Sequence, residues 1–155
     1  WAEAAGFTVT RRATGALPDA ATTLYLADTL GELGVFFRAI AITFIGGSLV
    51  PVGGHNLLEP ARLDAAILTG PHLGNFTSLA ARFRAAGAML VVADAAGLAD
   101  AVARLLADPA ARSDLAAAAG SVAAEGSAGL ARIVAAVLPL VDPATAAPAA
   151  SGEVS

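Results

Sequence analysis

The sequence predicts an α/β fold, with a Rossmann-like parallel sheet sandwiched by helices. Short apolar runs alternate along the chain with segments of helical spacing, and this alternation is typical of units in which parallel strands are joined by helices. The apolar runs end in glycines or in helix-start signals, as expected where a strand leads into a helix. With 155 residues the chain can bury a full core and fits one domain.

The composition excludes several classes of function. All nine basic residues are arginine and the net charge is −4, which does not indicate a nucleic-acid-binding protein. The absence of cysteine excludes disulfides and thiolate metal sites and is compatible with a reducing cytosol. Every apolar run stops before the roughly 18 residues that a spanning helix requires, so we expect no membrane span and no signal peptide in this sequence. Trp1 in place of an initiator methionine suggests a fragment or a processed chain.

The first forty residues predict two strands and a helix. Residues 7–10 are β-prone, and 23–27 alternate apolar and β-branched residues like a buried strand. Thr29 and Glu32 then have the spacing of a capping box, in which two residues satisfy each other's backbone donors at a helix start. The helix that follows carries apolar residues at helical spacing, which we expect to face the core: Leu33, Phe36, Phe37 and Ile40.

A glycine-rich stretch follows the apolar strand expected at 41–45. Residues 46–54 contain four glycines, and Asn56 and Glu59 again have the spacing of a capping box. Glycines let backbone N–H groups approach a ligand, and a helix N-terminus adds donors and about half a positive charge. The stretch therefore predicts an anion-binding loop. An ordinary strand-to-helix connection is the alternative.

His55 and Glu59 are four residues apart, but they do not indicate a metal site. There is no third ligand nearby and no H-E-x-x-H motif, and the second histidine, His72, follows a separate strand. We expect no metal. His55 is expected to close the loop by hydrogen bonding or to reach a phosphate or sugar oxygen.

The second half of the chain predicts two further strands and a series of helices. The strands are expected at 65–69 and 89–93, with a helix over 79–86 between them. Residues 1–141 are expected to form the domain, and the Pro/Ala/Ser tail at 142–155 has too little to bury and is expected to be disordered. Breaks in the alanine-rich helical region are expected at Asp108-Pro109, Gly120, Gly126 and Pro139.

Three motifs follow one another in a characteristic order. They are Ala27-Asp28-Thr29-Leu30-Gly31-Glu32-Leu33, then Gly-Gly-Ser-Leu-Val-Pro-x-Gly-Gly-His-Asn-x-Leu-Glu-Pro at 46–60, then Gly70-Pro71-His72 with Asn75-Phe76. With these motifs the chain resembles the Kdo transferases, which move 3-deoxy-D-manno-octulosonic acid (Kdo) from CMP-Kdo onto lipid A precursor. The resemblance is clear from about Arg11 to Asp94 and corresponds to the C-terminal half of such enzymes.

The resemblance implies the C-terminal domain of a GT-B glycosyltransferase, with residues 1–141 as its CMP-Kdo-binding part. The N-terminal domain, which would bind the lipid A precursor (lipid IVA) and carry the general base, is absent from this sequence. The full-length enzyme would act in lipopolysaccharide biosynthesis at the cytoplasmic face of the bacterial inner membrane, with this domain in the cytosol. The fragment alone would be inactive. No cofactor is expected, because backbone dipoles can stabilise the CMP leaving group.

The resemblance also implies a donor site. In transferases of this type, a carboxylate in the first turn of the corresponding helix commonly accepts hydrogen bonds from both ribose hydroxyls, and Glu59 matches that position. For Glu32 and Glu59 the capping box is a complete structural alternative, and His72 and Asn75 either touch the sugar carboxylate or brace their loop. The residues expected to bind CMP-Kdo are Leu30, Gly31, Glu32, Gly46, Gly47, Ser48, His55, Asn56, Leu57, Leu58 and Glu59.

Some positions depart from the family pattern, and other functions remain open. Leu57 stands where proline is usual, and Val52 occupies a position that is often basic, so one phosphate contact is in doubt. A UDP-sugar-dependent GT-B transferase or epimerase is the alternative enzyme, and a non-catalytic nucleotide-binding module is the alternative from another class. An NAD-dependent oxidoreductase and a P-loop NTPase are disfavoured by the glycine spacing and by the absence of lysine.

Overall fold

The computed structural model describes residues 1–141, without the side chains at 127–131 and 139; the tail predicted at 142–155 lies outside the described residues. The strands are β1 (Val9–Arg11), β2 (Leu24–Leu26), β3 (Ile42–Ile45), β4 (Ala66–Thr69) and β5 (Leu90–Val91). The α-helices are α1 (Leu33–Ala39), α2 (Leu58–Ala61), α3 (Thr77–Ala85), α4 (Ala95–Ala107) and α5 (Pro109–Val141). Short 3-10 helices lie at η1 (Glu3–Ala5), η2 (Arg12–Thr14) and η3 (Gly74–Phe76).

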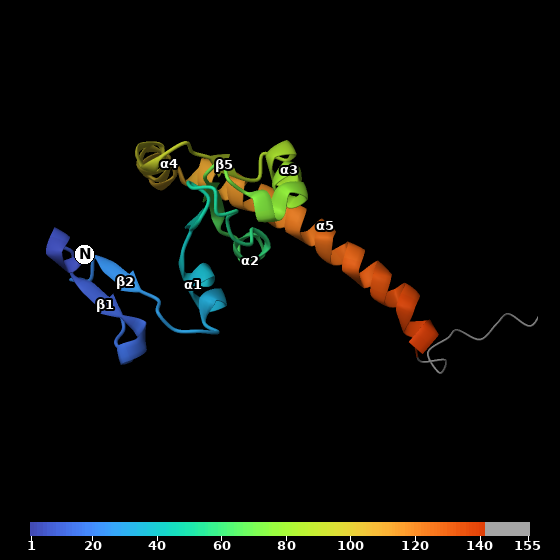
Figure 1. Ribbon diagram of the computed structural model, residues 1–155, viewed down its shortest axis with the longest axis horizontal. Helices are drawn as coiled ribbons and strands as arrows, with labels where there is room; N and C mark the ends of the chain where they lie inside the picture. Colours follow the sequence, from blue (N-terminus) through green and yellow to red (C-terminus); the bar gives the residue numbers. More distant parts are fainter. Residues whose placement is uncertain (142–155) are drawn as a thin grey trace, which may run out of the picture.

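The described strands run parallel but form two separate sheets. β1 pairs with β2, and β3, β4 and β5 pair in chain order. Figure 1 shows β1 and β2 lying apart from the three-stranded sheet, to which they are joined through the segment that holds α1. The parallel arrangement agrees with the sequence prediction, but the single sheet expected there is divided into two.

Strand β4 is the centre of the core. All four of its residues are buried, because helices cover both faces of a parallel sheet. Ile67 packs on one face with Phe83 of α3 and Ala119 of α5, whereas Leu68 packs on the other face with Leu105 of α4. The β3–β5 sheet is therefore sandwiched by helices, as the sequence predicted.

The break expected at Asp108-Pro109 is confirmed. Asp108 ends α4, and its Oδ1 atom accepts the N–H of Ala111 in the first turn of α5. Pro109 occupies the first position of α5, where its missing N–H costs nothing.

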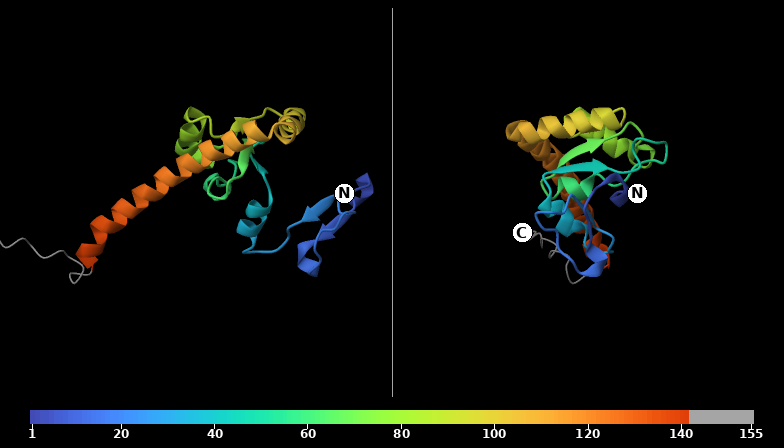
Figure 2. Two further views of the ribbon diagram at one scale, coloured as in Figure 1. Left: turned by 180° about the vertical axis from the view of Figure 1, so that it is seen from behind. Right: turned by 90° about the vertical axis from the view of Figure 1, so that its left-hand side faces the viewer.

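The other breaks predicted in this region are wrong, because α5 continues through Gly120, Gly126 and position 139. A helical glycine costs only about 1 kcal/mol relative to alanine, which packing elsewhere along the helix offsets. Gly120 lies against α2, since a Cβ atom built on it would be 3.6 Å from the Ala61 carbonyl oxygen. Figures 1 and 2 show α5 extending well beyond the sheet.

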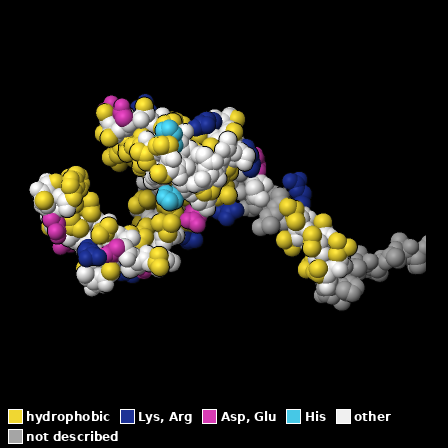
Figure 3. Space-filling view, in the orientation of Figure 1, with side chains coloured by type: hydrophobic (Ala, Val, Ile, Leu, Met, Phe, Trp, Pro, Cys, Tyr) yellow, Lys and Arg dark blue, Asp and Glu magenta, His cyan; other side chains and the backbone are white. Residues whose placement is uncertain are grey.

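The outer part of α5 carries a run of exposed apolar side chains. Figure 3 shows them as a largely hydrophobic surface at the end of the helix. They are Ile133, Val134, Val137, Leu138, Leu140 and Val141. Even so, no helix within residues 1–141 is both long enough and apolar enough to cross a membrane.

Helix α1 does not pack as the sequence predicted. None of its residues is buried; Leu33 at its start is 52% exposed, and Ile40, which directly follows it, is 41% exposed. The ring of Phe36 lies edge-on to that of Tyr25 in β2, with the centroids 6.0 Å apart. The expected core contact is missing because β1 and β2 stand apart from the β3–β5 sheet. Phe36 and Phe37 are only half-buried, and Leu33 and Ile40 are exposed.

Candidate functional site

A hollow of about 430 Å³ lies between α1 and α2, within the size range of small-molecule sites. Its lining comes from two separate segments of the chain: Gly31, Leu33, Gly34, Glu59, Arg62 and Leu63. The first segment follows β2 and the second follows β3. Both therefore lie beyond the carboxyl ends of parallel strands, where open α/β sheets bind ligands.

Glu59 stands in the first turn of α2 and lines this hollow. The turn is fixed by Asn56, whose Oδ1 atom accepts the N–H of Leu58 at 3.0 Å, and by Leu57, which is fully buried in the core. The Glu59 side chain is exposed and makes no hydrogen bond or ion pair with any described residue. Its carboxylate oxygens are therefore available to a ligand.

Glu32 is held very differently on the opposite side of the hollow. Its carboxylate accepts hydrogen bonds from Arg12, with Nη2 at 2.7 Å from Oε1, and from the Thr29 hydroxyl. These bonds lower the pKa of Glu32 to about 2, with the Arg12 bond the larger cause. The same pair raises the pKa of Arg12. The oxygens of Glu32 are thus already used within the protein.

Neither predicted capping box forms as the sequence indicated. Glu32 bonds the hydroxyl of Thr29 rather than its backbone, and α1 begins only at Leu33 without a side-chain cap. In the second motif Asn56 does accept a backbone N–H, but Glu59 does not return a bond to it. Helices α1 and α2 are short, with seven and four residues, so tertiary contacts determine their starts more than capping does.

Ser48 joins the glycine loop to the end of β4. It is fully buried; its hydroxyl donates to the Ile45 carbonyl and accepts the N–H of Gly70 at 2.7 Å. The Ser48 carbonyl in turn accepts the N–H of His72 at 2.9 Å. Ser48 therefore fixes the loop after β3 against the loop after β4.

The same two loops also touch where glycines leave no room for side chains. A Cβ atom on Gly53 would lie 2.5 Å from the Asn75 side-chain nitrogen, and one on Gly54 would lie 2.6 Å from Leu73. Both glycines have positive φ angles, +98° and +69°, which other residues rarely adopt. Asn75 donates its backbone N–H to the Gly53 carbonyl at 3.2 Å, so its position braces the loop.

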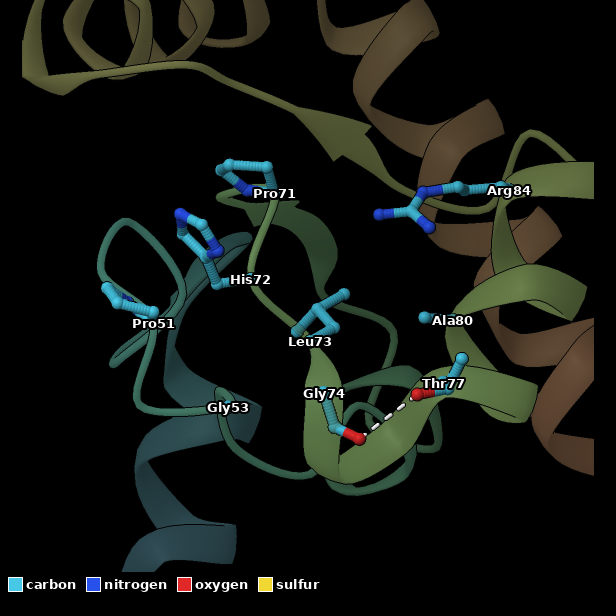
Figure 4. A pocket seen from close by; sticks show the side chains of 9 residues that line it. All are labelled: Pro51, Gly53, Pro71, His72, Leu73, Gly74, Thr77, Ala80 and Arg84. Atoms are coloured by element: carbon cyan, nitrogen blue, oxygen red, sulfur yellow. Dashed lines mark hydrogen bonds between the residues drawn. The ribbon is translucent and has the colours of Figure 1, made fainter.

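These two loops and helix α3 line a second hollow of about 390 Å³ (Figure 4). His72 and the guanidinium of Arg84, from α3, line it together with Pro51 and Pro71. Thr77 also lines it, and its hydroxyl donates to the Gly74 carbonyl at 3.0 Å. Both basic side chains are exposed.

The structure brings some of the expected donor-binding residues together and separates others. Gly31 and Glu59 meet in the first hollow, and the His55 ring lies over Gly46 and Gly47. Leu30 is fully exposed and lies outside the lining of that hollow. Ser48 and Leu57 are fully buried, so their side chains have structural roles. Direct contact with a donor remains a prediction for every residue of the set.

Sequence reasoning missed the residues that complete these hollows. Arg62, one turn after Glu59, lines the first hollow, and Arg84 lines the second. Arg12 acts on the first hollow through Glu32. An i, i+3 spacing after Glu59 was the one signal in the sequence for Arg62; nothing in the sequence pairs Arg12 with Glu32.

As regards metal ligands, the described part of the chain contains no cluster of three or more His, Cys, Asp or Glu side chains.

Several known proteins are similar to this chain, although no protein-family model matches it. It is 38% identical over 111 residues, 71% of its length, to the 3-deoxy-D-manno-octulosonic acid transferase of Bordetella pertussis. It is 42% identical over 73 residues to the transferase of the same name from Haemophilus influenzae, and 38% identical over 91 residues to a probable mitochondrial one from Arabidopsis thaliana. The chain spans only 26%, 17% and 20% of the lengths of these relatives.

A solved structure is also similar to this one. The C-terminal CMP-Kdo binding domain of WaaA from Acinetobacter baumannii superposes with a TM-score of 0.75 at 36% sequence identity. The match covers 78% of this chain and 63% of that domain. It confirms the predicted fold class, the α/β C-terminal domain of a GT-B transferase.

Proposed function

We propose that residues 1–141 form a CMP-Kdo-binding domain. The chain belongs to the 3-deoxy-D-manno-octulosonic acid transferase family. The nucleotide occupies the hollow between α1 and α2. One observation carries this proposal: Gly31 and Glu59, from two motifs far apart in the sequence, line the same hollow at the carboxyl ends of parallel strands.

Within this hollow, Glu59 accepts hydrogen bonds from the two ribose hydroxyls. A carboxylate offers two acceptor oxygens in one plane, which suits a vicinal diol, and those of Glu59 are free of protein partners among the described residues. Glu32 contributes differently, because its carboxylate is bound to Arg12 and Thr29; it holds Gly31 in position for backbone contact. The glycine loop at 46–54 presents backbone N–H groups that stabilise negative charge on the CMP leaving group.

The full-length protein is then a glycosyltransferase that moves Kdo from CMP-Kdo to lipid A precursor. The acceptor site and the general base belong to a part of the protein outside this sequence, whereas residues 1–141 supply the donor site. The reaction would take place at the cytoplasmic face of the bacterial inner membrane, where this domain would face the cytosol. The chain alone binds the donor without turning it over.

The nucleotide base separates this proposal from its alternatives. A Kdo transferase domain binds CMP more tightly than UMP, whereas a transferase or epimerase for UDP-sugars has the opposite preference. A non-catalytic module has no reason to prefer the nucleotide of the family's donor. Calorimetric titrations with CMP, UMP and UDP test this, and equal affinities for CMP and UMP would refute the base-specific part of the proposal.

The substitution Glu59→Gln tests the site itself. Glutamine keeps the shape of the side chain but loses the charge and one acceptor, so about 1.5 to 3 kcal/mol of binding free energy should be lost. We expect CMP affinity to fall roughly ten- to hundredfold by calorimetry. The melting temperature without ligand should not change, because Glu59 makes no bond within the described structure.

A matched control is Glu125→Gln, which removes the same charge from an exposed side chain paired with Arg82 on α3, outside the hollow. CMP affinity should stay at the wild-type value. A second readout is 2′-deoxy-CMP, which lacks one of the two hydroxyls and should discriminate less between wild type and Glu59→Gln. If Glu59→Gln binds CMP as tightly as wild type does, the ribose contact is refuted.

A further inference from the structure

The second hollow carries positive charge that no described residue balances. Arg84 and His72 both line it, and neither side chain makes a hydrogen bond or ion pair within the described part of the chain. No aspartate or glutamate is among the described residues that line the hollow, although acidic residues outnumber Lys and Arg in the chain by 13 to 9. The hollow therefore fits a ligand group with negative charge.

The two arginines in the last turn of α3 are used differently. Arg82 donates to the Glu125 carboxylate at 3.0 Å and to the Val122 carbonyl, both on α5. Arg84 has no such partner, and Figure 4 shows its guanidinium extending from α3 toward the side of the hollow where Pro71 lies. The helix dipole favours an arginine in a last turn, but it does not require this direction.

The surroundings of Arg84 and His72 are rigid and partly apolar. Leu73 and Ala80 line the hollow with side chains that are buried in the core. The backbone N–H of His72 is fixed by its bond to the Ser48 carbonyl. Charge-assisted hydrogen bonds are stronger beside apolar groups than in open water, so Arg84 gains more from an anion here than it would at an open surface.

The glycine loop connects this hollow with the first one. Pro51 and Gly53 of the loop line the second hollow, and Glu59, which follows the loop on α2, lines the first. In the proposed function the ribose lies at Glu59 and the phosphate lies at the glycine loop. The sugar that is joined to this phosphate is then within reach of the second hollow.

The two hollows also differ in charge. The first is lined by one carboxylate, Glu59, and one guanidinium, Arg62, whereas the charged or titratable side chains of the second are all basic. Kdo is an acid, so CMP-Kdo carries a carboxylate in addition to its phosphate. Glu59 repels this carboxylate and Arg84 attracts it. Charge therefore favours the ribose in the first hollow and the acidic sugar in the second.

We propose that the second hollow binds the carboxylate of the Kdo residue in CMP-Kdo, with Arg84 and His72 as the donors. The inference rests on the proposed function, which places the nucleotide in the first hollow. The planar guanidinium of Arg84 offers two parallel N–H groups to the two carboxylate oxygens, and the imidazole of His72 has an N–H to donate in either protonation state. A neutral sugar leaves Arg84 without a partner, so the hollow selects an acidic one.

Calorimetric titrations of the chain with CMP and with freshly prepared CMP-Kdo test this site. Wild type should bind CMP-Kdo more tightly than CMP. The substitution Arg84→Gln should weaken CMP-Kdo binding roughly ten- to hundredfold, because it removes the charge and the paired donors. CMP affinity should not change, since CMP has no carboxylate. His72→Ala should have a smaller effect on CMP-Kdo, about three- to tenfold, because it removes a single donor.

Arg104→Gln is the matched control. Arg104 is an exposed arginine of α4 that has no hydrogen-bond or ion-pair partner among the described residues and lines neither of the two hollows. This variant should bind both ligands as wild type does. Arg84→Lys keeps the charge without the planar pair of donors, so it should restore only part of the affinity that Arg84→Gln loses.

The outcomes distinguish failure of this inference from failure of the proposed function. If Arg84→Gln binds CMP-Kdo as tightly as wild type does, while CMP binding still depends on Glu59, the carboxylate site is overturned and the nucleotide site stands. Equal losses for CMP and CMP-Kdo would also overturn the carboxylate site, because Arg84 would then act on the nucleotide. If wild type binds neither ligand, the proposed function itself fails.

The NMR signal of the Arg84 Nε–H group, assigned by its loss in Arg84→Gln, reports on the hollow directly. CMP-Kdo should shift this signal, whereas CMP and inorganic phosphate at the same concentration should not. An equal shift with inorganic phosphate would show a general phosphate site and would overturn the proposal.

Discussion

The two sides of the first hollow are built in opposite ways. The side that carries Glu59 is anchored in the core. Leu57 is fully buried directly before α2, and the hydrogen bond between Ser48 and Gly70 fixes the glycine loop to the end of β4. The side that carries Gly31 is attached through a half-exposed ion pair, and none of its neighbours in α1 is buried. One side of the proposed donor site is therefore preformed, and the other depends on charge.

This difference separates what each side contributes. A preformed loop presents backbone donors without an ordering cost on binding, which suits a phosphate. A side held by half-exposed charges is cheaper to move, because surface ion pairs contribute little to stability. The comparison predicts that substitutions at Ser48 and Gly70, where the two loops join, change the free energy of unfolding. Substitutions around Glu32 should instead change the local order of the Gly31 side.

The largest loss of folding stability is expected for Gly70→Ala. A Cβ atom at this position would overlap the Ser48 carbonyl group and lie 2.6 Å from the Leu49 nitrogen, and backbone atoms cannot move aside cheaply. We expect a loss of at least about 3 kcal/mol in the free energy of unfolding, measured by urea denaturation. The control is Gly74→Ala in the neighbouring turn, where a Cβ atom would meet nothing within 4 Å. Equal stability of the two variants would contradict a rigid junction.

A smaller loss of folding stability is expected for Ser48→Ala. The substitution leaves the buried N–H of Gly70 without its partner, which should cost about 1 to 3 kcal/mol. The matched control is Ser121→Ala on the exposed face of α5, where the hydroxyl only bonds the Ala117 carbonyl one turn earlier and its loss should be neutral or slightly favourable. Chemical denaturation of both variants measures the difference. If Ser48→Ala kept full stability but lost CMP binding, Ser48 would be a ligand contact rather than a junction.

The smallest effect concerns acid pH and the Gly31 side. The pKa of Glu32 is lowered from 4.5 to about 2. Its contribution to the stability of the Gly31 side is therefore complete above about pH 4.5 and is lost as the pH falls toward 2. In this range we expect the amide signals of residues 28–34 to shift in NMR spectra before those of β4. In an Arg12→Leu variant this early shift should move toward pH 4.5. Simultaneous changes in β4 and in residues 28–34 would show that the two sides are not separable.

The parts of the fold that the sequence predicted well are the strands β3 and β4, which carry core residues. The strands expected at 41–45 and 65–69 are found at Ile42–Ile45 and Ala66–Thr69, because short, mostly apolar runs that end at a glycine leave few alternatives. The apolar stripe of α1 was visible in the sequence, but its exposure was not. Spacing identifies the apolar face of a helix and carries no information about whether another element covers it.

The candidate site was predictable in its motifs and not in its contacts. The sequence indicated Gly31 and Glu59 separately, and their meeting in one hollow follows from topology. The pairing of Arg12 with Glu32 joins residues twenty positions apart, and no local pattern encodes it. Ser48 shows the opposite difficulty: a serine in a glycine-rich loop has the same pattern whether it binds a ligand or another loop.

The reach of α5 has a mechanical consequence. Among the described side chains of α5, Ala123 is the last in the core, and the stretch 124–141 that follows it is about 27 Å long at about 1.5 Å per residue. Such a lever amplifies small rotations: a tilt of about ten degrees at its base displaces the tip by nearly 5 Å. A single probe on Val137, which is exposed, would therefore convert slight rearrangements around β4 into a readily measured distance.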